Sequence, residues 1–432
     1  MNGKEYETDV LIIGAGAAGI PAAIGAARAG ADVMLVEEDA RPGGAPIDQY
    51  VLMPDGGPRS GIVTEITDRL AENYPLTDRP VDEWWNFWYL PSDYQKVVYD
   101  MLEAEDNITL ICGVKVEGLN SEDAPVRRRV TGARWHLPDG SQARVDAKIT
   151  IDSTGVGNLP ARLGADARYG EDAAEDFGED IAPSRRSDRV QLCTWKYISQ
   201  KLGDAEPFDF RRLELNFPLE SGHGWCRGDA EGLMRRNAGA YLHWGCRIRC
   251  PDTRDPAALA DTQRRALRLM RPDLESLREH GYAVHLAPRI GVREQWRIIG
   301  EAVVTSNDAF QGRIPDDSIM ITRRPIDIWS EEVEGMEEFP ETRPYGVPYR
   351  ALIPRGFEGL LVAGKHMSGT HLAMASYRVQ CLLGIIGQAA GVAGAFCARK
   401  GSETRDADFT TLKDMLTSPP QNVILDPERL FS

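Results

Sequence analysis

The run from Asp9 to Gly44 constrains the fold more than any other part of the sequence. It contains, in order, an apolar stretch, a glycine-rich turn, a stretch of small residues, a glycine stop and a second apolar stretch that ends in an acid, at 10–13, 14–19, 20–29, 30 and 33–37. Short apolar stretches on either side of a small-residue helix are typical of a β-strand, α-helix, β-strand unit. We therefore expect an α/β fold that begins here.

The spacing of the glycines in the turn predicts a dinucleotide site. Gly14 permits the tight turn, Gly16 lets the backbone approach a pyrophosphate, and Gly19 lets the helix pack closely on the strand. The helix N-terminus, with Ala17 and Ala18, would offer its free N–H groups to the phosphates. Because strand, glycines, helix, strand and acid stand in the right order, we interpret the run as a complete fingerprint.

The residues after the second strand narrow the choice of dinucleotide. Glu37 could accept hydrogen bonds from ribose hydroxyls, and its carboxylate would repel a 2′-phosphate, which argues against NADP. Gly43 and Gly44 resemble the extended fingerprint of FAD proteins of the glutathione-reductase type, in which a second glycine turn follows the ribose acid. This resemblance implies noncovalent FAD, since residues 45–48 include no His or Cys that could tether a flavin. The predicted contacts also include three neighbours: Glu38, Arg41 and Ala45.

The composition limits the partners and the compartment. A net charge of −16 argues against nucleic acid or an anionic membrane surface. Seven scattered cysteines without a leader predict reduced thiols in the cytoplasm, and no Cys/His set completes a metal site. The apolar stretch 381–397 is broken by Gln388 and by glycines, so we do not expect a membrane span. The scarcity of Lys relative to Arg suggests a GC-rich bacterial genome.

The domain boundaries are set where the nucleotide-binding pattern stops and resumes. The pattern is lost where strand-like segments alternate with a helix near 257–270, and it resumes with a buried strand at 359–364. We predict a Rossmann-like FAD-binding domain assembled from both ends of the chain, with a β-rich substrate domain inserted between them. The predicted parts are the first FAD-binding segment (with an aromatic segment at 50–90), the substrate domain, the second FAD-binding segment and a C-terminal tail: 1–165, 186–345, 346–400 and 401–432.

Three local patterns carry further expectations. Segments 130–135 and 143–149 indicate a hairpin, followed by a separate buried strand at 149–152. The acidic segment 165–185 indicates an exposed loop. The aromatic block 84–89 could wall a pocket for a ring substrate, or it could form a core or dimer patch.

Four further segments resemble one protein family. They are Ile151-Asp152-Ser153-Thr154-Gly155-Val156-Gly157, similar to the strand-end "ATG" turn of flavoproteins with two dinucleotide folds, and 293–301, 348–354 and 361–371, similar to "RESRRIxGE", "PYRxLxP" and "LLVAGRxxSxxH". Together they resemble the broad bacterial FAD-dependent oxidoreductase family, which is related to fumarate reductase flavoproteins. The order and spacing of the segments cover nearly the whole chain.

The resemblance implies a role for each block. Val116 would lie beside the adenine, Thr154 and Gly155 would turn around the FAD, and Gly364 would pass the ribityl chain. The helix that follows Arg378 would point its N-terminus at the pyrimidine edge of the flavin, where reduced flavin carries negative charge. Two residues of the last block would border the cofactor: Ser376 and Arg378.

Three residues are candidates for the chemistry. His371 could take a proton while hydride leaves to the flavin, or it could only hydrogen-bond the flavin or cap a helix. Arg293 could clamp a carboxylate or polarise a carbonyl, or it could form an ion pair with Glu294 or Glu301. Tyr349 could line the pocket or pack in the core.

The expected activity is a two-electron, FAD-dependent oxidation or reduction of a small organic substrate, with dehydrogenation of an alcohol or a ring C–H/C–OH favoured. The sequence contains no second GxGxxG, so we expect a separate electron acceptor or O₂ in place of a built-in NAD(P)H domain. Two alternatives stay open: an FAD monooxygenase, and a flavoprotein with a lyase, hydratase or structural role. A homo-oligomer is compatible with each of these three functions.

Overall fold

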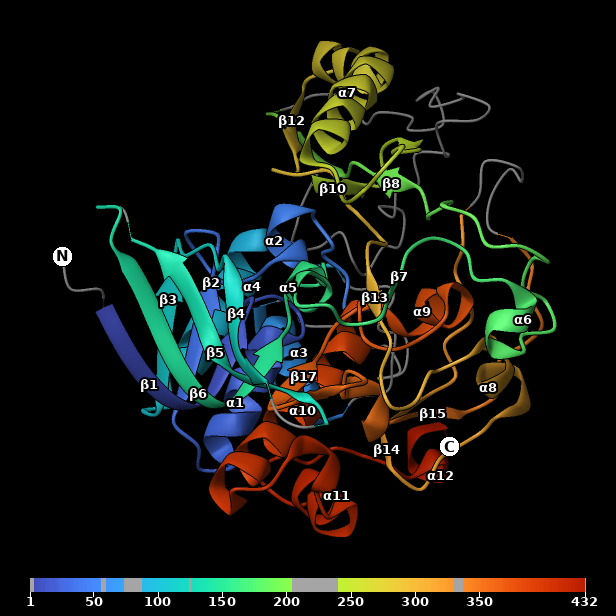
Figure 1. Ribbon diagram of the computed structural model, residues 1–432. Coiled ribbons are helices and arrows are strands. Elements are labelled where there is room, and N and C mark those ends of the chain that lie inside the picture. Colours follow the sequence, from blue (N-terminus) through green and yellow to red (C-terminus); the bar gives the residue numbers. More distant parts are fainter. Residues whose placement is uncertain are drawn as a thin grey trace.

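A computed structural model describes residues 4–55, 60–73, 88–123, 126–137, 139–203, 240–329 and 337–431. Its largest sheet has the order β16-β5-β6-β1-β2-β3 (Figure 1). The pairs β1–β2, β1–β6 and β2–β3 are parallel, which confirms the predicted α/β class and its Rossmann-like core. The central strands are β1 (Lys4–Ile13), β2 (Val33–Glu37), β3 (Ile108–Cys112) and β6 (Gln142–Asp152).

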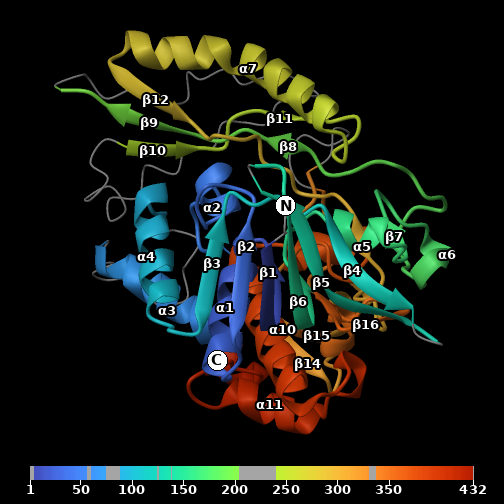
Figure 2. The same ribbon diagram turned by 60° about the vertical axis from the view of Figure 1, so that its left-hand side comes forward.

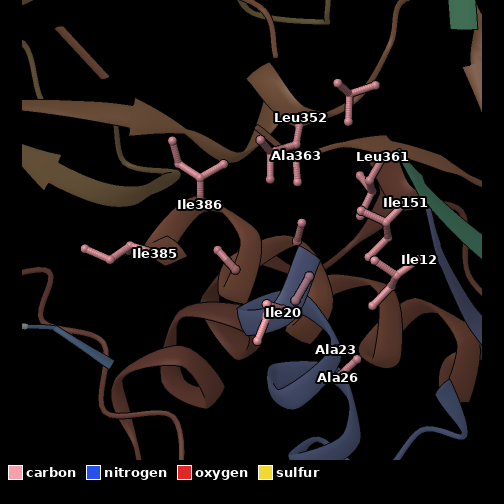
Figure 3. Packing of buried hydrophobic residues seen from close by; sticks show 14 of the residues in the cluster. Ile12, Ile20, Ala23, Ala26, Ile151, Leu352, Leu361, Ala363, Ile385 and Ile386 are labelled. Carbon is pink, nitrogen blue, oxygen red and sulfur yellow. The ribbon is translucent and has the colours of Figure 1, made fainter. Parts of the chain in front are cut away.

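Both ends of the chain contribute to this sheet. Strand β17 (Leu360–Val362) pairs in parallel with the end of β6, and β16 (Phe357–Glu358) pairs with β5 (Arg128–His136). Figure 3 shows Ile12, Ile151 and Leu361 side by side, one each from β1, β6 and β17. The C-terminal segment therefore completes the sheet that the N-terminal fingerprint begins.

Strand β6 differs from the sequence prediction. It runs without a break through residues 142–152, whereas a hairpin strand and a separate buried strand were expected there. The first half of β6 pairs antiparallel with β5, and β1 pairs with β6 along nearly its whole length. The apolar residues at 149–151 are buried because β1 and β17 flank them on both sides.

Helix α10 (Gln380–Lys400) packs on α1 (Gly19–Arg28) through glycines. A Cβ on Gly387 would lie 2.0 Å from the carbonyl oxygen of Ala18, and one on Gly391 would lie 2.0 Å from that of Ala22. Only glycine permits so close an approach of the two backbones. By length and composition α10 could cross a membrane, but 94% of its most apolar window is buried inside the protein.

A smaller core lies on one side of the main body, opposite α11 (Figures 1 and 2). It consists of the antiparallel sheet β10-β9-β12 and helix α7 (Pro256–Glu279), and its buried residues fall between 193 and 290. Ile298, Ile319 and Tyr345 pack in the larger core, whereas Ile326 and Ile328 form a small third cluster with Leu372 and Ala375. We call this smaller core the inserted unit, and the predicted bounds of the substrate domain, 186–345, stay a prediction. The sheet strands are β9 (Tyr197–Lys201), β10 (Ala240–His243) and β12 (Tyr282–Leu286).

Further helices and strands make up the rest of the described secondary structure. They are α2 (Ala45–Asp48), α3 (Gly61–Asn73), α4 (Pro91–Glu103), β4 (Gly118–Asp123), α5 (Asn158–Arg162), β7 (Ala167–Arg168), α6 (Ala174–Phe177), β8 (Cys193–Thr194), β11 (Arg247–Ile248), β13 (Arg297–Ile298), α8 (Ser306–Gln311), β14 (Ser318–Thr322), β15 (Tyr345–Pro348), η3 (Tyr349–Leu352), α9 (His371–Tyr377), η4 (Thr404–Asp406), α11 (Phe409–Thr417) and α12 (Pro427–Phe431). Of the aromatic block, 84–87 lie outside the described residues, while Trp88 and Tyr89 are buried in the larger core.

Candidate functional site

The two predicted glycine turns meet after β1 and β2. Gly14 donates its N–H to the Val36 carbonyl at 2.8 Å, and Gly43 donates to the Ala15 carbonyl at 2.8 Å. A Cβ on Gly44, whose φ is +57°, would lie 2.8 Å from the Gly16 Cα. The backbone of Gly16 therefore leaves no room for a side chain at Gly44.

The N-terminus of α1 is open to an anion. No described group accepts a hydrogen bond from the backbone N–H of Gly16, Ala17 or Ala18, and no side chain caps the helix. A Cβ on Gly19 would lie 1.7 Å from the Gly14 carbonyl oxygen, so this glycine allows the helix to begin against the strand. Unbonded N–H groups at a helix N-terminus fit the pyrophosphate of a dinucleotide.

Glu37 lies at the end of β2 and holds the first turn. Its carboxylate accepts hydrogen bonds from the N–H of Ala15 at 2.6 Å and of Asp39 at 3.0 Å. Burial raises the pKa of Glu37, although these two bonds oppose the shift. The Glu37 carbonyl accepts from Val114 N at 2.9 Å, which brings the segment of the predicted adenine contact, Val116, next to the ribose acid.

The other predicted contacts of this region lie on a more exposed loop. Glu38 is exposed and lies 3.6 Å from Arg289 of the inserted unit. Arg41 lies 3.5 Å from Asp48, and Ala45 is the first residue of α2. Burial and the neighbouring Asp39 raise the pKa of Asp48 to about 6. These residues surround the second glycine turn without blocking it.

A third turn lies where β6 and β17 end. Thr154 donates its N–H and its hydroxyl to one oxygen of the buried Asp152, at 2.9 and 2.7 Å. Gly155 has φ of +72°, Gly364 has φ of +142°, and a Cβ on Gly364 would lie 3.9 Å from the Gly155 Cα. Both turns follow neighbouring parallel strands at their carboxyl ends, which is where open α/β sheets bind ligands.

His366, which the sequence analysis did not select, sits behind this turn. Its Nε2 lies 3.4 Å from Asp152, and both side chains are fully buried. Burial alone would raise the pKa of Asp152, but His366 and the bonds from Thr154 lower it below its usual value. The buried pair of His366 and Asp152 therefore supports the turn at Thr154 and Gly155 from the interior of the protein.

His371 is the first residue of α9 and belongs to a buried polar network. Its backbone N–H donates to Asp172 at 2.9 Å, and its Nδ1 lies 2.9 Å from the Glu294 carboxylate. Arg297 contacts both acids, at 2.5 Å from Asp172 and 3.4 Å from Glu294. No described group hydrogen-bonds to the second ring nitrogen of His371, Nε2.

The acids set the charge of His371. Burial by itself would lower the pKa of His371, but Glu294 outweighs this effect and raises it above its ordinary value. The pKa of Glu294 is lowered in spite of its burial, because His371 and Arg297 stabilise the carboxylate. The carboxylate therefore orients the ring and stabilises its protonated form, which leaves Nε2 to exchange a proton with a ligand.

Arg293 does not form either ion pair that the sequence suggested. Its Nη1 donates to the Leu192 carbonyl at 2.5 Å and to the Thr194 hydroxyl at 2.6 Å. Glu294 pairs with His371, and Glu301 pairs with Arg127 at 2.8 Å. Within the described part of the chain Arg293 faces no carboxylate partner.

Two predicted residues are engaged elsewhere in the core. The Tyr349 hydroxyl donates to the Thr404 carbonyl at 2.7 Å, and its ring stacks on Phe409 at a centroid distance of 6.3 Å. Ser376 donates to the Arg324 carbonyl at 2.5 Å and contacts the Tyr345 hydroxyl at 2.7 Å. For Tyr349 these contacts favour the core-packing interpretation.

The acidic segment 165–185 departs from its predicted exposure. Asp172 and Glu179 are 3% and 1% exposed, because Asp172 meets Arg297 and Glu179 accepts from Ser306 N and the Thr370 hydroxyl. Arg297 lies inside the 293–301 motif, so its charge was a signal that the acids of this segment had a buried partner. The described residues contain no group of three or more His, Cys, Asp or Glu that could hold a metal ion.

The family model described as FAD dependent oxidoreductase matches residues 9–416. The comparison with curated proteins gave no match. Among solved structures, similar chains include a geranylgeranyl bacteriochlorophyll reductase-like protein from Thermoplasma acidophilum (12% identity, 96% of this chain and 84% of that chain covered, TM-score 0.47). Others are the myxobacterial chondrochloren halogenase CndH (11%, 95% and 78%, 0.46) and a flavoprotein/dehydrogenase from Cytophaga hutchinsonii (12%, 95% and 83%, 0.41).

Proposed function

The chain belongs to the FAD-dependent oxidoreductase family, and from this premise we propose that it dehydrogenates a small organic substrate at an alcohol or a ring C–H/C–OH. FAD is its cofactor. When bound, FAD supplies the acceptor for two electrons, transferred as a hydride. We propose that FAD is held without a covalent bond, that the electrons then pass to a separate acceptor or O₂, and that the protein works in the cytoplasm.

The residues of the two glycine turns would hold the cofactor. The unbonded N–H groups of Gly16, Ala17 and Ala18 would bind the pyrophosphate, and Glu37 would bind the ribose. A Cβ on Gly16 would meet the Gly44 Cα only at 3.9 Å, so the side of Gly16 is open to the close approach of a phosphate. This arrangement favours a dinucleotide over a mononucleotide.

The observation that carries the proposed reaction is the contact of His371 Nδ1 with Glu294. In an oxidation, the substrate oxygen would lose its proton to Nε2 of His371 as the C–H bond breaks. Glu294 would stabilise the imidazolium that forms, as a carboxylate does for the histidine of other acid–base sites. In the reverse direction the same imidazolium would donate the proton to the carbonyl oxygen.

Anaerobic mixing of the FAD-loaded protein with a panel of alcohols, sugars, cyclitols, hydroxy acids and amines tests the proposal. We expect one class to remove the oxidised-flavin absorbance and to appear as the carbonyl product. Uptake of O₂ that requires NAD(P)H and yields a hydroxylated product would replace this function with a monooxygenase. Flavin that no member bleaches would favour a role without net redox chemistry.

A further inference from the structure

A group of four basic side chains lies beside the His371 network, and its positive charges outnumber the carboxylates that pair with them among the described residues. Its members, which we call the cation cluster, are Lys196, Arg293, Lys365 and Arg378. They come from the β8–β9 connection, the segment before β13, the residue after the Gly364 turn and the residue after α9. Segment 191–194 contacts two of them, Arg293 and Arg378.

The segment around β8 joins the cluster to the network. Gln191 accepts a hydrogen bond from Arg378 Nη2 at 3.0 Å, and its backbone N–H donates to Glu294 at 3.3 Å. Arg293 contacts Leu192 and Thr194 of the same segment. Gln191 and Glu294 therefore connect Arg378 of the cluster to His371 by a chain of hydrogen bonds.

Lys365 ties the cluster to the cofactor turn. Its Nζ donates to the Val292 carbonyl at 2.5 Å, next to Arg293 in the chain. A Cβ on Gly155 would lie 3.6 Å from the Lys365 Cε, so the stem of this lysine crosses the turn predicted to enclose the FAD. The cluster thus lies between the cofactor turn and the inserted unit.

The acids near the cluster are already paired. Glu294 contacts His371 and Arg297, and Asp55 contacts Arg324 at 2.9 Å. Asp327 lies 3.7 Å from Arg378 and 3.8 Å from Arg324, so it is shared between two arginines. In the described ranges, Lys196, Arg293 and Lys365 make no ion pair with any carboxylate.

The shifted pKa values agree with this shortage of negative charge. Burial, and then repulsion from Arg293, lower the pKa of Lys196 to about 7. Burial, and then Arg378, lower that of Lys365 to about 8. Half-buried cations that repel one another are costly without an anion, and function is a common reason to retain them.

We propose that the cation cluster binds an anionic group of the substrate, a carboxylate or a phosphate, and so places the carbon to be oxidised next to His371. This inference rests on the proposed function and deepens it by naming the substrate class. Arg293 has one edge engaged by the protein, while Nη2 and Nε have no described partner and could form the fork that recognises an oxyanion. Lys196, whose Nζ lies 4.2 Å from the centre of the Trp244 ring, would add a second charge.

Binding of malonate and of inorganic phosphate to the FAD-loaded protein, followed by calorimetry and by the flavin spectrum, tests the proposal without turnover. We expect one of the two probes to bind, and its identity distinguishes a carboxylate from a phosphate substrate. Lys196→Met and Arg293→Met should each weaken that probe by about 10–100-fold, the loss expected for one charge-assisted contact. Lys196→Met keeps the apolar stem over Trp244 and removes no described hydrogen bond, so it should fold.

Arg264→Met is the matched control, because the Arg264 side chain is 70% exposed on α7 and its ion pair among the described residues is with Asp261. It should leave probe affinity unchanged. The proposal would be overturned if neither probe changed the flavin spectrum on binding. It would also be overturned if Lys196→Met, Arg293→Met and Arg264→Met all lost the same amount of affinity. A neutral alcohol that bleaches the flavin of the parent and of Lys196→Met equally would also overturn it, while leaving the dehydrogenase function intact. Malonate binding without bleaching by any substrate would instead count against the proposed function alone.

Discussion

Glu294 controls the protonation of His371, and this gives the reaction a defined pH dependence. Oxidation needs the neutral ring, and Glu294 raises the pKa of His371, so flavin reduction by substrate should increase with pH through a value above the ordinary histidine pKa. Glu294→Gln removes the stabilising charge but keeps the side-chain shape. In that variant burial dominates and lowers the pKa of His371, so the increase in the reduction rate should occur at lower pH. Stopped-flow reduction at a series of pH values measures this, and an unchanged profile would show that His371 is not the titrating group.

His371 itself should be needed for the rate and not for the cofactor. We expect His371→Ala to retain FAD and to slow flavin reduction by roughly 10²–10⁴-fold, the usual contribution of general base catalysis. Tyr349→Phe is the control, because the Tyr349 hydroxyl donates to Thr404 within the core and should affect stability by only about 1 kcal/mol. If His371→Ala reduced its bound FAD within about threefold of the parent rate, far below that range, the proton would have to move elsewhere.

Gly16 should matter for the cofactor and not for the fold. A Cβ at Gly16 meets only the Gly44 Cα, at 3.9 Å, an ordinary contact, whereas one at Gly19 would lie 1.7 Å from the Gly14 carbonyl oxygen. Gly16→Val should therefore fold and lose FAD, because its side chain fills the approach to the pyrophosphate. Far-UV circular dichroism and the FAD content of the purified variant check the two parts. A yellow Gly16→Val protein would move the pyrophosphate away from this turn.

At the scale of elements, the α1–α10 contact should determine stability. We expect Gly391→Ala to destabilise the protein by about 1–3 kcal/mol, since its Cβ would lie 2.0 Å from the Ala22 carbonyl oxygen and the helices would have to separate. Gly394→Ala on the same helix is the matched control, because its nearest neighbour is the Ile151 Cδ1 at 3.3 Å. Denaturant unfolding compares the two. Ala favours a helix interior over Gly by about 1 kcal/mol, so an equal gain in both variants would mean that helix propensity, and not the close approach, decides the effect.

The elements also show how far sequence patterns reach. The bounds of α1 and β2 were predicted within one residue because small-residue helices and buried strands are local signals, whereas β1 begins at Lys4, before the predicted 10–13, because its first half is polar. Strand β6 was divided in two because its partners change from β5 to β17 along its length, which a local pattern does not contain. Asp172 and Glu179 were expected to be exposed because acidity favours solvent, but residues distant in the chain contact and bury them: Arg297, Ser306, Thr370 and His371. The site followed the same rule: His371 was selected locally, but its partner Glu294 required the fold.

At the scale of the whole molecule, the site exists only when three parts of the chain meet. The N-terminal turns provide the places for the FAD, β17 and α9 bring Gly364 and His371, and the segment before β13 brings Glu294. Loss of one part should therefore remove the chemistry even where the others fold. Figures 1 and 2 show the smaller core on the side of the main body that is opposite α11. The three parts of the site meet near the carboxyl ends of the sheet strands.

The most direct test of the whole account is an anaerobic single turnover of the purified, FAD-loaded protein with the substrate found in the panel. The amounts of flavin reduced and of carbonyl product formed are then compared. Because one hydride carries both electrons, the account predicts one product for each FAD reduced, without NAD(P)H, and release of intact FAD when the protein is then denatured. Flavin that stays with the denatured chain, or product that forms only with O₂ and NAD(P)H, would contradict it.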